Sequence, residues 1–363
     1  MHTIIMRKKY NTKAVTAVLL ALALAVSMSG LRLGVFSSYA TTTCVPAGST
    51  GLTAYFVAAN GQTIKGHSID ATGCDIGIYV PPGSSGVTIV GNTITGANDH
   101  GIMVQDSKNV AIIGNTVTGN GVAPNSAIQE NKAIELVGTS LSIVKNNIVT
   151  YNTADGGIGI ADDGAINPGA PNPGSANPAF GNVITGNDIE YNLFGCGIVI
   201  AAYNSNGGVY GNIVTDNTVL GASFATVGQY GPAVGGIVIA ADVPNSNVGG
   251  NVVQDNLING SLIPGVVIHS NAPGDLVFGT VVNHNTISSN GDETDTTDEP
   301  PAPNGVMIVS EVFPGMPNPP KITGTVVNSN TVTDDYYGVW TCGTSLTVIH
   351  NLMGDSVVPI ASC

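Results

Sequence analysis

Apolar residues alternate with other residues in short runs along most of the chain, as at Ile78 and Val80 or at Ile198 and Ile200. This spacing predicts strands, because every second side chain of a strand points to the same face. Val, Ile and Thr dominate these runs, and the chain holds 48 Gly. Helical repeats would instead place apolar residues three and four positions apart. The pattern therefore predicts an all-β chain of short strands.

Two short phrases recur in a fixed order. The first is Gly-Ile/Val-x-aliphatic, and it starts at Gly77, Gly101, Ala133, Gly157, Gly197, Gly236, Gly265, Gly305 and Gly338. The second places an Asn among aliphatic residues, and its column comprises Asn92, Asn115, Asn146, Asn187, Asn217, Asn256, Asn285, Asn330 and Asn351. The interval between successive Asn varies from 21 to 45 residues. A constant repeat with loops of variable length is typical of a solenoid, in which each repeat buries its apolar face against its neighbours.

The Asn column is predicted to be structural. Asn tolerates a tight-turn conformation better than most residues do. When coils stack, each amide can donate to the coil below and accept from the coil above. We therefore expect an inward ladder of mutually hydrogen-bonded Asn side chains.

The phrases GNTITGN and GIMV resemble those of the right-handed parallel β-helix repeat proteins with a pectin-lyase-like fold, which include NosD-type and polysaccharide-processing proteins. The resemblance covers about residues 76–355. It implies an all-β, single-stranded, right-handed parallel β-helix of about nine coils. We expect a signal peptide at residues 1–40, an N-terminal cap at 41–75 and the β-helix at 76–363. The shared residues build the coil, so the resemblance predicts fold better than function.

The first forty residues differ from the repeats. Basic residues at positions 7–13 precede the apolar run AVTAVLLALALAV, and Ser38-Tyr39-Ala40 has the small-x-small form of a cleavage site. The alternative is an uncleaved anchor, because residues 14–31 carry no charge. Both alternatives predict a secreted or cell-surface protein that meets the membrane only through this leader.

Charge narrows the choice of partners. All 24 acidic residues follow Ala40, whereas only five basic residues do, and none of these is Arg. Nucleic acid and anionic lipid require clustered Lys and Arg, so both are excluded as partners. The sequence leaves the oligomeric state open.

The chain has five cysteines, and an exported protein meets an oxidising environment in which cysteines pair. Cys44 and Cys74 flank the start of the coil, and Cys342 and Cys363 bracket its last turn. The ends of a solenoid must be closed. We therefore expect disulfides Cys44–Cys74 and Cys342–Cys363, with Cys196 as a small buried residue between coils.

Alignment of the Gly-Ile phrases places polar residues on one outer face of the first four coils, whereas the later coils present an apolar stripe through Val238 and Met307. We expect this polar face to comprise Asp75, Asp99, His100, Gln105, Asp106, Lys132, Glu135, Asp155, Asp162 and Asp163. Any ligand is expected there, between the loops at 119–131 and 161–180. The predicted ligand-binding residues are Tyr79, Gln105, Glu135, Asp162 and Asp163.

Three functions remain open, and the third, a NosD-like role in the maturation of a metal enzyme, has no Cys/His/Met copper cluster to support it. The first is a carbohydrate-binding or structural scaffold that contacts a polysaccharide or a cell-surface glycan, with acidic residues that only cap turns and solvate the surface. The second is a calcium-dependent lyase or epimerase acting on uronate-containing glycans, which needs a base for the C5 proton and a neutralised substrate carboxylate.

The enzyme hypothesis assigns roles to particular residues. Lys132 or His100 would be the base, Asp99 and Asp155 would carry the general acid, and a calcium ion would be held by Asp75, Asp99 and Asp155. Two departures count against it. The repeats lack Arg, and Asp162-Asp163 stands without the other motifs of polygalacturonase-type hydrolases.

Overall fold

The structure of the chain is a computed structural model. It describes residues 43–48, 50–123, 131–153, 156–163, 177–193, 195–222, 235–262, 264–291, 304–310, 312, 315–343, 346–356 and 358–362. The chain divides into two compact units, residues 1–41 and 42–363. The first unit, and with it the predicted signal peptide, lies outside the described residues. Within the described ranges, no helix is long and apolar enough to cross a membrane.

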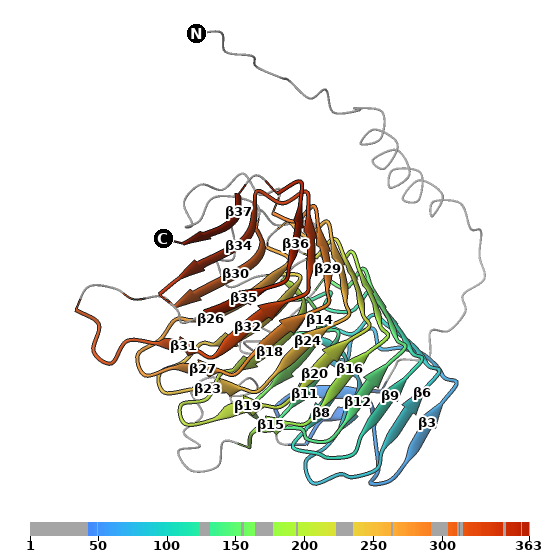
Figure 1. The fold of residues 1–363 in the computed structure, drawn as a ribbon. Helices are drawn as coiled ribbons and strands as arrows, with labels where there is room; N and C mark the ends of the chain where they lie inside the picture. Colours follow the sequence, from blue (N-terminus) through green and yellow to red (C-terminus); the bar gives the residue numbers. More distant parts are fainter. Residues whose placement is uncertain are drawn as a thin grey trace, which may run out of the picture. The chain divides into compact units, whose positions relative to one another are not determined.

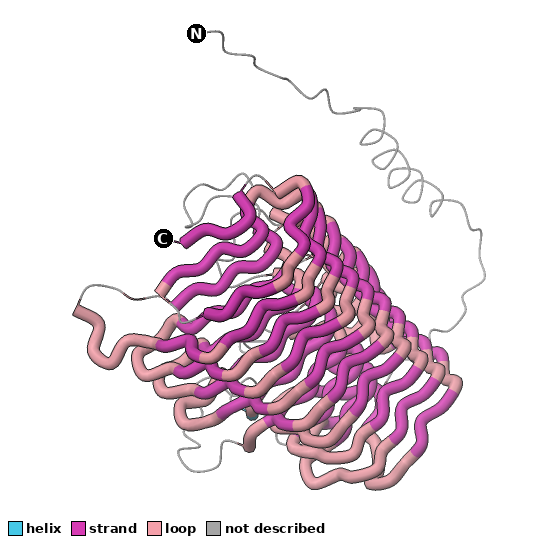
Figure 2. Tube along the Cα trace, viewed as in Figure 1, coloured by secondary structure: helices cyan, strands magenta, loops and turns pink. Residues whose placement is uncertain are grey.

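The described residues form strands in four sheets, which we call sheets A to D (Figures 1 and 2). Sheet A contains β1 (Val45–Pro46), β2 (Thr53–Val57), β5 (Ile76–Val80), β8 (His100–Gln105), β11 (Ile134–Val137), β14 (Gly156–Ala161), β18 (Cys196–Ala202), β22 (Ile237–Ala241), β26 (Val266–Ser270), β30 (Asn304–Ser310), β34 (Tyr337–Cys342) and β37 (Val358–Ser362). Sheet B contains β3 (Thr63–Lys65), β6 (Thr88–Val90), β9 (Ala111–Ile113), β12 (Ile143–Lys145), β16 (Val183–Thr185), β20 (Ile213–Thr215), β24 (Val252–Gln254), β28 (Val281–Asn283), β32 (Thr325–Asn328) and β35 (Leu346–Ile349).

The remaining strands make two further sheets. Sheet C contains β4 (Ser68–Asp70), β7 (Thr93–Thr95), β10 (Thr116–Thr118), β13 (Ile148–Thr150), β17 (Asp188–Glu190), β21 (Thr218–Leu220), β25 (Leu257–Asn259), β29 (Thr286–Ser288), β33 (Thr331–Thr333) and β36 (Leu352–Gly354). Sheet D contains β15 (Ala179–Phe180), β19 (Gly208–Tyr210), β23 (Asn247–Gly249), β27 (Leu276–Phe278) and β31 (Lys321–Thr323).

The chain visits the sheets in a repeating order. One coil runs through β18, β19, β20 and β21, in sheets A, D, B and C, and the next coil starts at β22. Neighbouring strands within each sheet are parallel, except that β1 pairs antiparallel with β2. This arrangement confirms the predicted parallel β-helix.

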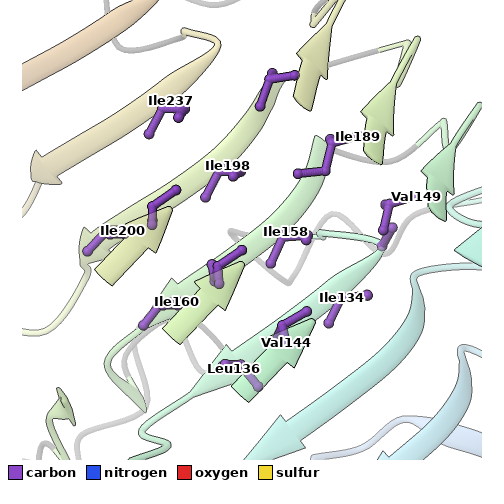
Figure 3. Packing of buried hydrophobic residues seen from close by; sticks show 14 of the residues in the cluster. Ile134, Leu136, Val144, Val149, Ile158, Ile160, Ile189, Ile198, Ile200 and Ile237 are labelled. Carbon is purple, nitrogen blue, oxygen red and sulfur yellow. The ribbon is translucent and has the colours of Figure 1, made fainter. Parts of the chain in front are cut away.

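The inward side chains stack in columns along the coil. Ile134, Ile158, Ile198 and Ile237 are register partners on successive strands of sheet A, and all are buried (Figure 3). Sheets B and C contribute one central inward residue per strand, such as Val144 and Val149. The alternation seen in the sequence therefore corresponds to one continuous apolar core.

The recurring Gly near the start of most sheet A strands is required by close packing. At Gly197, an added Cβ would lie 2.5 Å from the carbonyl oxygen of Gly236 in the next coil and would also meet Val219 of the core. Both neighbours are fixed by the fold, so a side chain at this position would force the coils apart.

The predicted Asn ladder is present at the corner between sheets B and C. In each pair, the backbone N and the Nδ2 of one Asn donate to the Oδ1 of the next at 2.9–3.0 Å, from Asn92 through to Asn351. One predicted member is wrong. In the third coil the ladder residue is Asn147, because Asn115 donates to Asn147 and Asn147 donates to Asn187.

Asn146 has a different role, which explains the misassignment. It occupies the left-handed conformation with φ 54°, at the position that immediately precedes the ladder residue. The equivalent residues in other coils, such as Gly114, Asp216 and His284, also have positive φ. The tight-turn conformation therefore belongs to the residue before each ladder Asn, so our expectation that the ladder Asn itself adopts it was wrong.

Two further ladders were not predicted. One links Asn120, Asn152 and Asn192 at the corner after sheet C, and the other links Asn182, Asn212 and Asn251 at the corner before sheet B. Their sequence signal is a five-residue spacing, because a three-residue strand and a two-residue corner separate successive ladders. Asn182, Asn187 and Asn192 show this spacing within one coil.

Asp335 takes a ladder position in the last coils. Its Oδ1 accepts from the backbone N of Asn290 at 2.7 Å, its Oδ2 is buried without a hydrogen-bond partner, and burial raises its pKa to about 7. The folded state holds this proton more tightly than the unfolded state, so stability falls as pH rises from about 4 to 7. We expect Asp335→Asn to stabilise the protein by on the order of 2 kcal/mol at pH 8 and to be nearly neutral at pH 4, measured by urea unfolding.

The matched control is Asp334→Asn. Asp334 is exposed and has φ 59°, a conformation that Asn also tolerates. We expect it to change stability little at either pH. A gain in the Asp335→Asn variant that is equal at both pH values would contradict the assignment of the effect to this buried carboxyl group.

The first of the two predicted disulfides is confirmed. Cys44 and Cys74 are bonded with a Cα–Cα distance of 5.5 Å. Cys342 is also disulfide-bonded, and its predicted partner Cys363 lies outside the described residues. Cys196 is a buried thiol, as expected.

Candidate functional site

The outward column of sheet A has the predicted members but lies in a buried environment. Register pairs Tyr79 with Met103, Met103 with Glu135 and Glu135 with Gly159, and the column continues to Val238 and beyond. Tyr79 and Met103 belong to one buried apolar cluster, and Val199, Val238, Val267, Met307 and Trp340 belong to another. The predicted apolar stripe is therefore packed within the protein.

The proposed catalytic residues share this burial. Asp99, His100, Lys132 and Glu135 retain at most 2% of their surface. His100 Nδ1 lies 3.0 Å from the carbonyl oxygen of Lys132, to which it donates in the tautomer protonated at Nδ1. Burial lowers the pKa of His100 to about 4, so the imidazole is neutral at ordinary pH. The structure brings these residues together, but it closes them from solvent.

Glu135 lies across the strand of the next coil. A Cβ at Gly159 would fall on the Glu135 carboxylate, so the absence of a side chain at Gly159 makes room for it. The carboxylate therefore occupies the space directly above the neighbouring backbone.

Other predicted residues have structural partners. Tyr79 donates from its hydroxyl to Gln105 Oε1 at 2.6 Å, and burial followed by the Asp106 charge raises the pKa of Tyr79 to about 12. Asp75 accepts from the backbone N and the Oγ1 of Thr53, both at 2.8 Å, and so fixes the start of β2. Asp155 lies outside the described residues. Within the described ranges, no group of three or more His, Cys, Asp or Glu residues is arranged to hold a metal ion.

A surface pocket opens at the carboxyl edge of the sheet A strands, and we call it the carboxyl-edge pocket. Its volume is about 360 Å³, and it spans four coils. Its lining comprises Gly83, Ser84, Asp106, Ser107, Lys108, Gly138, Ser140, Asn177, Pro178 and Phe180. Asp106 directly follows β8, Gly138 directly follows β11, and Phe180 ends β15. The pocket therefore lies at the carboxyl ends of the sheet A strands of the first four coils, and Asp106 is the one member of the predicted polar face in its lining.

Asp106 is the central ionisable group of the pocket. Its Oδ1 is buried without a hydrogen-bond partner, and the side chain of Asn177 hydrogen-bonds the carboxyl group. Burial raises the pKa of Asp106 to about 6, and the charge of Asp163 contributes in the same direction. Gly138 makes room for this carboxyl group, because a Cβ there would collide with Oδ1. Asp106 can therefore accept a hydrogen bond, or donate one when protonated.

Asp162 and Asp163 lie beside this pocket with different roles. Asp162 accepts from the backbone N of Tyr203 at 2.9 Å and of Asn204 at 3.2 Å, so it holds a turn of the next coil. Asp163 accepts from Asn204 Nδ2 at 3.1 Å and from the backbone of Asn177, and burial raises its pKa. Asn177 thus links Asp106 and Asp163.

The carboxyl edge continues with a second polar group that sequence reasoning missed. Asp242 Oδ1 lies 3.5 Å from His269 Nε2 and accepts from Asn271 Nδ2 at 3.1 Å. Burial raises the pKa of Asp242 to about 7. Asp275 accepts from the backbone N of Ala272 and Ser246 and so closes a turn. Asp242 and Asp275 therefore each contact residues of this group. None of these residues lines the carboxyl-edge pocket.

The lining residues Lys108, Ser140, Asn177 and Phe180 were also missed. Isolated β-bridges pair Ser85 with Lys108, Lys108 with Ser140, and Ser140 with Phe180, so Ser85, Lys108, Ser140 and Phe180 form one column. Each of these residues lies between the sheet A strand and the sheet B strand of its coil. Intervening segments of unequal length hide this correspondence in the sequence.

Residues 27–172 match a family model described as "Right handed beta helix region". The chain is a right-handed parallel β-helix. The matched segment includes the Asn ladder of the first coils and most of the carboxyl-edge pocket. A search of curated proteins found no match.

Solved structures with similar folds include three of different activities. The surface adhesin PfbA of Streptococcus pneumoniae is 12% identical, with 85% of this chain and 82% of that chain covered and a TM-score of 0.43. An alginate lyase from Paenibacillus sp. strain FPU-7 is 13% identical, with 85% and 90% covered and a TM-score of 0.41. The A-module of the mannuronan C-5 epimerase AlgE4 from Azotobacter vinelandii is 14% identical, with 84% and 91% covered and a TM-score of 0.38. The differences among these proteins leave the function to be argued from the site.

Proposed function

We propose that the protein is an exported, surface-located β-helix that binds carbohydrate in the carboxyl-edge pocket. The observation that carries this proposal is the chemistry of the pocket. Asp106, Lys108, Ser140 and Asn177 offer hydrogen-bonding groups beside the partly exposed ring of Phe180. A sugar presents hydroxyl groups that donate and accept, together with an apolar face that packs against an aromatic ring.

Export is supported by two independent features. The Cys44–Cys74 disulfide is expected to persist only in an oxidising compartment. The leader at residues 1–40 has the composition of a secretory signal. A location outside the cytoplasm would also bring the pocket into contact with cell-wall or environmental glycans.

Affinity electrophoresis in gels with soluble β-glucan, xylan, galactomannan, alginate or polygalacturonate tests the proposal. We expect at least one of these polymers to retard the wild-type protein. Asp106→Asn should weaken that binding by about tenfold or more, equivalent to about 1.4 kcal/mol, because a carboxylate acceptor becomes an amide. In the wild type, binding should weaken as pH falls through about 6, where Asp106 gains its proton. The Asp106→Asn variant should lack this dependence.

Asp188→Asn is the matched control, since Asp188 is exposed on β17 of sheet C. It should bind like the wild type. The absence of retardation with every polymer, or equal binding by the wild type and Asp106→Asn, would refute the carbohydrate site.

The alternative proposal is a calcium-dependent uronate lyase or epimerase, favoured by one observation. His100 is neutral and lies beside Lys132, as a proton acceptor requires. Asp99 and Asp155 would then supply the calcium site or the general acid. The burial of His100 and Lys132 counts against this alternative. Calcium-dependent formation of unsaturated uronate, as from a lyase, or of C5-inverted uronate, as from an epimerase, would establish the enzyme if it were lost in Lys132→Ala. The absence of both products on alginate and polygalacturonate would exclude it.

A further inference from the structure

One column of residues runs from the lining of the pocket onto the outer face of sheet D. Bridges and strand register connect, in order, Ser85, Lys108, Ser140, Phe180, Tyr210, Gly249, Phe278 and Thr323. Figure 1 shows β15, β19, β23, β27 and β31 stacked in this order. The column therefore runs along the coil axis, with one residue from each coil. Its first three residues are polar, and the aromatic residues Phe180, Tyr210 and Phe278 follow, with Gly249 between the last two.

Two of these aromatic residues are exposed to solvent, and Tyr210 is partly buried. Phe180 retains 42% of its surface and Phe278 retains 39%. The ring centroids of Tyr210 and Phe278 lie 6.5 Å apart although β23 separates their strands. Phe278 bridges this gap by leaning over Gly249, where a Cβ would collide with its ring. Gly249 thus allows Tyr210 and Phe278 to approach each other across the intervening coil.

The spacing of this surface suits a polysaccharide. Neighbouring parallel strands lie about 4.8 Å apart, which is close to the length that one β-linked hexose adds to an extended chain. Phe180 and Tyr210 lie on neighbouring coils, and the ring of Phe278 lies over Gly249 of the next coil. The three rings can therefore contact successive sugar rings. A peptide strand would need unpaired backbone groups at a sheet edge, whereas this surface is the face of a sheet.

The charges beside the column favour an uncharged chain. Asp106, Asp162 and Asp163 lie along its pocket end, and the Asp162 charge acts on the hydroxyl group of Tyr210. The whole chain carries 24 acidic and 10 basic residues. The three carboxyl groups outnumber Lys108, the one cation of the column. A polyuronate would therefore meet a net like charge at this end of the route, whereas a neutral glycan would not.

We propose that a neutral, extended polysaccharide lies along the coil axis on the outer face of sheet D, with successive sugar rings on Phe180, Tyr210 and Phe278. This inference rests on the proposed carbohydrate-binding function and adds the class of glycan, its direction and a second contact region beyond the pocket. One end of the glycan occupies the carboxyl-edge pocket, and the aromatic rings contact the sugars that follow.

Isothermal titration with oligomers of β-glucan, xylan and galactomannan tests the inference. The affinity of the wild-type protein should rise from dimer to tetramer to hexamer of the retained glycan. Phe278→Ala should weaken hexamer binding by about tenfold, while dimer binding in the pocket stays unchanged. Asp106→Asn should weaken the binding of both. Phe278→Tyr, which keeps the ring, should bind the hexamer like the wild type.

Leu257→Ala is the matched control, because Leu257 is also 42% exposed but lies on sheet C. It should leave hexamer binding unchanged, and the unfolding midpoint of each variant checks that the fold persists. If the affinity does not rise from dimer to hexamer, or if Phe278→Ala leaves hexamer binding unchanged, the proposed contact of the glycan with Phe180, Tyr210 and Phe278 is wrong. The carbohydrate site in the pocket would still stand. Tighter binding of alginate or polygalacturonate than of every neutral glycan would overturn the proposed ligand class. If no oligomer binds at all, the carbohydrate-binding function itself is wrong.

Discussion

Asn217→Ala is expected to lower the free energy of unfolding by about 3 kcal/mol. The Nδ2 of Asn217 donates to the carbonyl oxygens of Ile184 and Thr215 and to Asn256 Oδ1, at 2.9–3.0 Å. Its Oδ1 accepts from the backbone N and the Nδ2 of Asn187. Alanine would leave several buried polar groups of the neighbouring coils without partners. Urea unfolding followed by circular dichroism measures the loss.

Thr218→Ala provides the control for this prediction. Thr218 is the next residue, lies on β21 and is only partly buried. It should cost less than 1 kcal/mol, about the effect of losing some β-propensity. Equal unfolding midpoints for the two variants would show that the ladder adds nothing beyond the local strand.

Removal of the Cys44–Cys74 disulfide is expected to destabilise the protein by about 3 kcal/mol. The bond joins residues separated by 30 positions and so restricts the unfolded chain. Cys74 is buried in the first coil, where the apolar core would otherwise open to solvent. The double variant Cys44→Ala and Cys74→Ala should therefore unfold at lower urea concentration. Because coils contact only their neighbours, its N-terminal coils should become sensitive to protease first.

Cys196→Ala is the comparison for the disulfide variant. Cys196 is a buried thiol in the later coils, so its loss removes a small apolar side chain and no crosslink. We expect a cost of about 1 kcal/mol. A disulfide variant with the same midpoint and the same protease pattern as Cys196→Ala would contradict the stabilising role of this bond.

Part of the candidate site could be predicted from sequence. Alignment of the Gly-Ile phrases placed Glu135 on an outer face of the first coils and Val238 on an apolar stripe of the later coils, and the register puts both in one outward column. Alignment could not predict that the column is buried. We expected a side chain that points outward from its strand to be exposed to solvent. Its exposure also depends on which residues pack over it.

The off-by-one error at Asn146 has a similarly local cause. Lys145 is followed by two Asn residues, and both corner positions accept Asn. The first position requires positive φ, and the second requires an inward amide that can bond along the axis. Alignment on the first Asn chose the wrong one, although the following Ile148 and Val149 have the spacing of the residues after Asn92.

The sequence by itself determined the class of fold, the inward columns and the Cys44–Cys74 disulfide at the start of the coil. Alternation, corner residues and cysteine positions act over a few residues, so their consequences can be read locally. Only the tertiary structure decided where the polar residues meet solvent. Asp106, Gly138, Asn177 and Phe180 come from different coils joined by segments of unequal length. Their approach depends on the stacking register, which is a property of the whole solenoid and of no single repeat.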